Sequence, residues 1–444
     1  MPEVMAPSGR WRGRDAGGVS VFHGIRYARA DRFAPPRRVE ERDATADATR
    51  PAPSAPQSPS RLEAVMGAPH PYEQSEDCLT VTVTTPGGAE PGSLPVLVWL
   101  HGGAYLSGSG EWNLYDATRL VRETGIVVVS VSYRLGVLGY LRAPGVSPGN
   151  LGLLDQITAL EWVRDNIEAF GGDRARVTVA GQSAGAHSVA AMLGIERARG
   201  LFTRAILQSA PLGIGFHSRE RARRVAALFL AELGVDPRRA AVADVLAAQG
   251  RTARRLARPA GLATAPPLLP VLDADPMPGA RRWRETVRGR ASGLQVLMGD
   301  TADEMEAFHG PHPVVAAVRR VPVLGPRLVA AVRDATQDRI FDGPVRRFAD
   351  LLAGAGAEVY RYRVGRPHPG SPFGACHCVD LPLLLGDGPA WRDAPMLRPL
   401  SPGDVAALGA RTRRYWGEFV RTGRIADPAW PAHRPGSTHL HPLP

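Results

Sequence analysis

The chain contains no lysine, so all 54 of its basic residues are arginine. With 49 glycines and 41 prolines, this usage resembles the coding bias of a GC-rich genome. The formal net charge is +11, but the arginines are dispersed and form only short pairs such as Arg223-Arg224. Dispersed charges of this kind are typical of solvated helix faces. We therefore expect no nucleic-acid partner.

Cysteine is also scarce, because Cys78, Cys376 and Cys378 are the only three. An odd and small number excludes a disulfide framework and fits a reducing compartment. No apolar run is long enough to span a membrane, and the first residues lack the apolar core of a signal peptide. These absences predict a cytoplasmic protein with no membrane contact.

Apolar patterns indicate an α/β fold. Residues 96–100 and 126–131 are apolar almost throughout, as in strands buried on both faces. Between residues 153 and 170 apolar residues recur every three or four positions, which predicts an amphipathic helix. Further strands are predicted at residues 177–179, 201–209, 295–298 and 359–362. This alternation predicts a central, mostly parallel sheet flanked by helices.

Two helical stretches do not alternate with strands. Residues 216–262 are rich in arginine and alanine, and residues 311–353 are helical but interrupted by prolines. We expect both to be helical insertions near the active site, within a single domain that spans residues 1–444.

The strand at residues 177–179 leads into a G-x-S-x-G sequence at residues 181–185, which is followed by small residues at helical spacing. A strand that turns directly into a helix leaves little room for side chains, so glycines flank a serine whose hydroxyl is exposed. This pattern predicts that Ser183 is a nucleophile. A second G-x-S-x-G surrounds Ser147, but no strand precedes it and Pro148 has no N–H to donate. We therefore interpret Ser147 as a loop residue.

Acyl transfer by a serine also needs donors for the oxyanion. The strand at residues 96–100 runs directly into His101-Gly102-Gly103-Ala104, an HGGG-type turn with small residues. The expected donors are the backbone N–H groups of Gly103, Ala104 and Ala184.

The base and the acid should follow the serine in the order acid, then histidine. Among the 12 histidines, His187 lies on the serine's own helix and cannot easily fold back, whereas His377 lies in a loop after a late strand. His377 is therefore the predicted base. The residues alone leave the acid open among four candidates that follow the strand at residues 295–298: Asp300, Asp303, Glu304 and Glu306.

Several stretches match, in order, the motifs of one enzyme family: residues 22–28, 75–79, 101–104, 132–136, 149–156, 170–173, 181–185 and 208–209. With these motifs the chain resembles the type B carboxylesterases, the family of bacterial para-nitrobenzyl esterases and cholinesterases. The resemblance covers nearly the whole chain, and it implies an α/β-hydrolase fold.

The resemblance also implies roles for individual residues. Ser183 would be the nucleophile, His377 the base and Glu304 the acid of a serine hydrolase that cleaves small-molecule carboxylic esters through an acyl-enzyme. It further implies a salt bridge between Arg134 and Asp173 as part of the scaffold. The family's chemistry needs no cofactor, and the chain carries no phosphate-binding loop or dinucleotide fingerprint.

Other readings of the same residues remain open. An acyltransferase, a lactonase or a thioesterase could use the same triad with another acceptor. A non-catalytic cholinesterase-like binding protein is disfavoured, because such proteins typically lose triad residues. Cys376 and Cys378 flank His377, but three consecutive residues cannot surround one ion, so we expect no metal. The sequence leaves the oligomeric state open.

Overall fold

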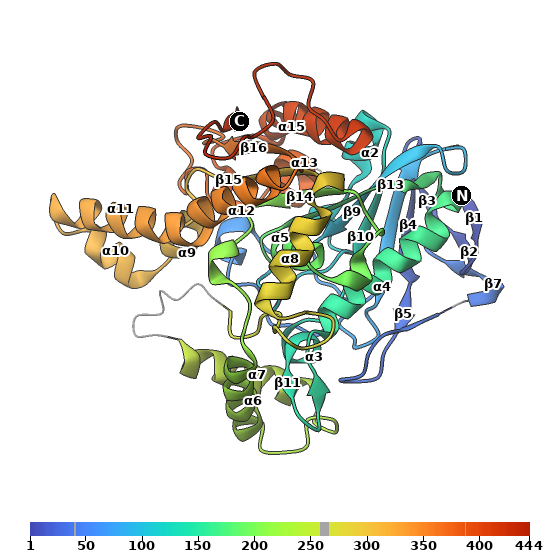
Figure 1. The fold of residues 1–444 in the computed structure, drawn as a ribbon, viewed down its shortest axis with the longest axis horizontal. Coiled ribbons are helices and arrows are strands. Elements are labelled where there is room, and N and C mark those ends of the chain that lie inside the picture. The colour runs from blue at the N-terminus through green and yellow to red at the C-terminus, as the bar shows by residue number, and fades with distance from the viewer. Residues whose placement is uncertain (40, 258–265, 387) are drawn as a thin grey trace.

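The computed structural model describes residues 1–39, 41–257, 266–386 and 388–444 (Figure 1). Within them, ten strands form one sheet in the order β17-β16-β15-β14-β13-β9-β10-β8-β4-β3. From β17 to β10 each pair of adjacent strands is parallel. The pairs β10–β8, β8–β4 and β4–β3 are antiparallel. The prediction of a mostly parallel sheet is therefore confirmed. The strands are β3 (Arg14–Asp15), β4 (Val19–Arg26), β8 (Thr80–Pro86), β9 (Leu94–Leu100), β10 (Val127–Val131), β13 (Gly172–Gln182), β14 (Arg204–Gln208), β15 (Gln295–Thr301), β16 (Glu358–Val364) and β17 (His441–Leu443).

The two faces of this sheet explain why its central strands are apolar throughout. Along β9, Val96, Val98 and Leu100 belong to one hydrophobic cluster, whereas Leu97 and Trp99 belong to another, and all five are fully buried. Successive side chains of a strand point to opposite faces, so a strand covered on both sides needs an unbroken apolar run.

Helices cover both faces of the sheet (Figure 1). The cluster around Val96 includes residues of α4 (Leu151–Asn166), α5 (Ala184–Leu193) and α8 (Ala280–Arg290). The cluster around Trp99 includes residues of α2 (Thr118–Thr124) and α15 (Pro402–Thr422). The helices on both faces bury the sheet as the core of the molecule.

Smaller strands lie outside the main sheet. At the N-terminus β1 (Glu3–Ala6) and β2 (Gly9–Arg12) form a hairpin, with β7 (Glu41–Asp47) parallel to β2. Elsewhere β5 (Ala28–Arg29) pairs with β6 (Arg37–Arg38), and β11 (Arg142–Ala143) with β12 (Ser147–Pro148). The interpretation of Ser147 as a loop residue was wrong in detail, because short antiparallel pairing with β11 places this buried serine in a strand.

Helices fill both of the stretches that we expected to be insertions, and Figure 1 shows α6–α7 and α10–α11 at the periphery. The first stretch contains α6 (Arg219–Leu233) and α7 (Val242–Leu256), and its residues 258–262 lie outside the described part of the chain. The second contains α10 (Pro313–Arg319), α11 (Leu324–Gln337), a π-helical turn (Asp338–Asp342) and α12 (Gly343–Gly354). None of the described helices has the length and apolar character needed to cross a membrane.

Candidate active site

Ser183 stands alone between β13, which ends at Gln182, and α5, which begins at Ala184. Its backbone angles are φ 54° and ψ −118°, a conformation that costs free energy for any residue with a side chain and is concentrated at functional sites. A Cβ on Gly181 would lie 2.4 Å from the carbonyl carbon of Gly185, and one on Gly185 would lie 2.0 Å from Leu100 O. The turn therefore admits only glycine at both positions, which is the physical basis of the motif.

His377 lies beside the serine, with Nε2 2.8 Å from Ser183 Oγ. On the other side of the ring, Nδ1 is hydrogen-bonded to Glu304 Oε2. The side chains of His377 and Glu304 are 1% and 0% exposed. The structure thus brings the three predicted triad residues into one hydrogen-bonded chain, in which His377 and Glu304 are buried and Ser183 is partly exposed.

Of the four acidic candidates, which lie at the end of β15 and in the loop after it, Glu304 is the one hydrogen-bonded to His377. The second oxygen of Glu304, Oε1, accepts a hydrogen bond of 2.8 Å from the N–H of Thr301, which fixes the carboxylate. The other three candidates form ion pairs with arginines instead: Asp300 with Arg363, Asp303 with Arg366, and Glu306 with Arg319 and Arg333.

Backbone hydrogen bonds join the loop of the acid to the loop of the base. The N–H of Asp303 donates to Ala375 O at 2.8 Å, and Asp303 and Cys376 pair as an isolated parallel bridge. The N–H of His377 donates to Glu304 O at 3.4 Å. Both loops leave adjacent parallel strands at the same edge of the sheet, and this pairing joins them again beyond the ends of β15 and β16.

Sequence reasoning missed three neighbours of His377. Gln182 Nε2 lies 3.2 Å from His377 Nε2 and also donates to Cys378 Sγ at 3.3 Å. The rings of Phe308 and Phe341 lie 5.1 Å and 5.4 Å from the imidazole. Phe341 belongs to the π-helical turn, a feature that recurs at functional sites but has no clear sequence signal.

The predicted oxyanion turn has positive φ angles at successive residues, 110° at Gly103 and 57° at Ala104. Gly103 is required there, because a Cβ would lie 2.0 Å from Ser107 O. Gly103, Ala104 and Ala184 all line the cavity that contains Ser183. Within the described residues, their three N–H groups donate no hydrogen bond to another part of the protein. They are available to an oxyanion in the cavity.

The side chain of His187 is hydrogen-bonded to a residue other than Ser183. Its Nδ1 is hydrogen-bonded to the hydroxyl of Tyr105 at 2.7 Å, and burial lowers the pKa of its imidazole to about 4. Cys376 and Cys378 are buried free cysteines. Among the residues that the structure describes, no group of three or more His, Cys, Asp or Glu side chains is arranged to hold a metal ion.

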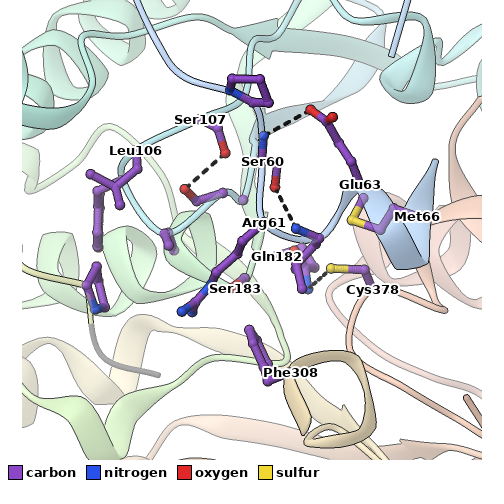
Figure 2. Close-up of a pocket in the computed structure, with 18 of the residues that line it drawn as sticks. Ser60, Arg61, Glu63, Met66, Leu106, Ser107, Gln182, Ser183, Phe308 and Cys378 are labelled. Carbon is purple, nitrogen blue, oxygen red and sulfur yellow. Dashed lines mark hydrogen bonds between the residues drawn. The ribbon is translucent and has the colours of Figure 1, made fainter. Parts of the chain in front are cut away.

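The cavity above Ser183 has a volume of about 230 Å³ (Figure 2). Its walls come from the segment 58–69, the oxyanion turn, α7 and the π-helical turn, so both helical stretches contribute. Most of the wall is apolar, and Met66, Leu106 and Phe308 are labelled examples in Figure 2. Among the described wall residues, only Arg61 and Glu63 are acidic or basic. Such a site suits a mostly apolar ligand with few polar groups.

The expected salt bridge between Arg134 and Asp173 is wrong. Arg134 instead forms a bidentate pair with Asp155, with Nε–Oδ2 and Nη2–Oδ1 distances of 2.8 Å and 2.7 Å. The two side chains are 5% and 0% exposed, whereas Asp173 is 26% exposed and pairs with Arg176. The reason is burial: a buried guanidinium needs a carboxylate at the same depth, and α4 supplies one.

Comparisons with known proteins identify the family of this chain. The model of the carboxylesterase family matches residues 1–311. The chain belongs to the carboxylesterase family. It is 66% identical over 441 residues to a protein of Rhodococcus erythropolis described as a probable N-octanoylanthranilate hydrolase, AqdA2, covering 99% of this chain and 97% of that protein. It is 33% identical to the para-nitrobenzyl esterase of Bacillus subtilis, covering 97% and 92% of the two chains.

Solved structures support the same assignment. A thermophilic para-nitrobenzyl esterase superposes on this carboxylesterase with a TM-score of 0.82 at 31% identity, covering 99% of this chain and 95% of that chain. The carboxylesterase EST55 of Geobacillus stearothermophilus gives a TM-score of 0.79 at 30% identity, covering 97% and 94%. The enzyme therefore has the α/β-hydrolase fold and hydrolyses esters, and the predicted family, fold and enzyme class are confirmed.

Proposed function

We propose that the enzyme works through an acyl-enzyme formed on Ser183. The single observation that carries this proposal is the hydrogen-bonded chain from Ser183 Oγ through His377 to Glu304. Ser183 Oγ attacks the carbonyl carbon while His377 Nε2 takes its proton, and Glu304 orients the ring and stabilises the imidazolium.

The remaining steps return the enzyme to its starting state. His377 gives its proton to the leaving atom as the bond from the carbonyl carbon to that atom breaks, and the alcohol or amine departs. Water then attacks the acyl carbon, His377 accepts a proton from it, and Ser183 recovers that proton when the carboxylic acid leaves. The N–H groups of Gly103, Ala104 and Ala184 bind the oxyanion in both tetrahedral intermediates. These steps use groups of the chain, the substrate and water, and none of them involves a cofactor.

We propose an N-acylated anthranilate as the substrate. The support is the 66% identity, over 99% of this chain, to the relative described as a hydrolase of N-octanoylanthranilate. Such a substrate joins an apolar acyl chain to an aromatic amine through an amide, and the largely apolar cavity suits both parts. The same triad would cleave a carboxylic ester, whose leaving atom is oxygen.

We propose further that residues 1–444 form one domain with two helical insertions. The support is that one sheet contains strands from both ends of the chain, β3 and β4 near the N-terminus and β17 at the C-terminus.

A fluorophosphonate probe and two substrates test the mechanism. The probe should label the wild-type enzyme once, at Ser183, and the enzyme should hydrolyse both N-octanoylanthranilate and para-nitrophenyl octanoate. Ser183→Ala should abolish labelling and both activities, whereas the matched variant Ser147→Ala, in the second G-x-S-x-G, should retain them. Labelling that persists in Ser183→Ala would overturn the assignment.

A further inference from the structure

Arg61 is the one basic side chain among the described residues that line the cavity. We propose that its guanidinium binds a carboxylate carried by the leaving group of the substrate, next to the scissile bond. The inference rests on the proposed function, and it makes Arg61 the residue that distinguishes an acylated anthranilate from an uncharged acylated aromatic amine.

The location of Arg61 relative to the base is the first argument. Its guanidinium carbon lies 5.0 Å from the centroid of the Phe308 ring, and that ring lies 5.1 Å from the ring of His377. In Figure 2 the side chain of Arg61 extends across the cavity toward Ser183, with Phe308 beyond it. The positive charge therefore lies on the His377 side of the cavity.

The chemistry of that side is the second argument. During acylation His377 must protonate the leaving atom, so the leaving group has to lie within hydrogen-bond reach of the imidazole. The carbonyl oxygen meanwhile faces the donors Gly103, Ala104 and Ala184. The part of the substrate beside Phe308 and Arg61 is then the leaving group and not the acyl chain. In an anthranilate the carboxylate is ortho to the scissile nitrogen, so it lies on the same side.

The electrostatic environment is the third argument. Arg61 is an exposed residue, and partial desolvation of its guanidinium lowers the pKa of the group. An arginine nevertheless keeps its charge at neutral pH, and a charge with reduced hydration attracts an anion more strongly than one in bulk water.

The backbone on either side of Arg61 is well fixed. Ser60 Oγ accepts a hydrogen bond from Leu62 N–H at 3.2 Å, and Ser60 O accepts one from Glu63 N–H at 3.1 Å. Val65, in the helical turn α1 (Glu63–Met66), is fully buried. A guanidinium on a fixed backbone loses less conformational entropy when it binds, which favours recognition of a planar carboxylate by its paired N–H groups.

The decisive experiment compares charged and neutral amides. The substrates are N-octanoylanthranilate, its para isomer 4-(octanoylamino)benzoate, and the uncharged N-octanoylaniline. For the wild type we expect the highest kcat/KM with the ortho carboxylate. In Arg61→Met the ratio of kcat/KM for N-octanoylanthranilate to that for N-octanoylaniline should fall about 100-fold, the effect of losing a charged hydrogen-bonded contact. Arg61→Lys, which keeps the charge but loses the planar fork, should give an intermediate ratio.

Two controls separate this inference from the proposed function. Arg223→Met removes an exposed arginine of α6 that does not line the cavity, and it should keep the wild-type ratio.

Binding to Ser183→Ala, measured by calorimetry, does not depend on turnover. This variant should bind N-octanoylanthranilate about 100-fold more tightly than N-octanoylaniline, and adding Arg61→Met should remove that preference. Equal binding of the two amides by Ser183→Ala, or an unchanged ratio in Arg61→Met, would overturn the inference. Absence of turnover in the wild type would instead overturn the proposed function.

Discussion

The carboxylate of Glu304 is held between His377 Nδ1 and the N–H of Thr301. Glu304 and His377 are 73 positions apart, in loops that follow adjacent strands. Each oxygen of the carboxylate is therefore hydrogen-bonded, one to the imidazole and one to the backbone. This arrangement fixes the orientation of the ring and places a buried negative charge beside it.

Glu304→Gln tests whether that charge is needed. The amide keeps the shape of the side chain but cannot stabilise an imidazolium, so kcat for para-nitrophenyl octanoate should fall by a factor on the order of 10² to 10⁴. Glu306→Gln is the matched control, because Glu306 pairs with Arg319 and Arg333 and not with His377. A larger loss of kcat in Glu306→Gln would exclude Glu304 as the acid.

Ala184→Pro tests the oxyanion hole. Ala184 is the first residue of α5, a helix position at which proline is common, and the substitution removes its backbone N–H. The barrier to acylation should rise by roughly 2.7–4 kcal/mol, seen as a fall in kcat/KM. Proline cannot adopt the φ of 57° found at position 104. The control there is Ala104→Gly, which keeps the N–H. Its kcat/KM should fall far less than that of Ala184→Pro. Circular dichroism should first establish that both variants fold, and full activity in folded Ala184→Pro would remove this N–H from the mechanism.

The buried pair of Arg134 and Asp155 should contribute more to the free energy of unfolding than the partly exposed pair of Arg176 and Asp173. Asp155→Asn leaves a buried guanidinium without its counter-charge, so the free energy of unfolding in urea should fall by about 3–5 kcal/mol. Asp173→Asn breaks only the partly exposed pair with Arg176 and should cost less than about 1 kcal/mol. The opposite order of the two losses would contradict the observed pairing.

Asp380 should make stability depend on pH. Burial raises the pKa of its carboxyl group from the ordinary value of 3.8 to about 6, while Gln208 Nε2 donates to Oδ2 at 2.6 Å. The folded state then binds a proton more tightly than the unfolded state, so the contribution of Asp380 to stability is full below pH 3.8 and is lost as the pH rises through about 6. The loss amounts to about 3 kcal/mol.

Asp380→Asn removes this titration. The free energy of unfolding of the variant minus that of the wild type should therefore increase between about pH 4 and pH 7, measured by urea denaturation at several pH values. Titrating groups that do not interact with Asp380 cancel in this difference. A difference that stays constant over the range would show that Asp380 does not titrate there.

The sequence alone determined the features that depend on neighbouring residues. The apolar run of β9 is unbroken because its alternate side chains pack into a hydrophobic cluster on each face of the sheet. The G-x-S-x-G sequence around Ser183 follows from a turn so tight that Gly181 and Gly185 have no space for a Cβ. Such constraints act over a few positions, so they leave a pattern that can be read along the chain.

Only the tertiary structure decided which distant groups meet. Residue chemistry left four acids open, and the folded positions of these side chains, at the end of β15 and in the loop after it, gave His377 the partner Glu304. Depth of burial, which no local pattern encodes, gave Arg134 the partner Asp155. Arg61 is one of 54 arginines in the sequence, and its position over Phe308 exists only in the folded chain. Contacts between residues far apart depend on where the packed elements place them, and that information is spread over the whole chain.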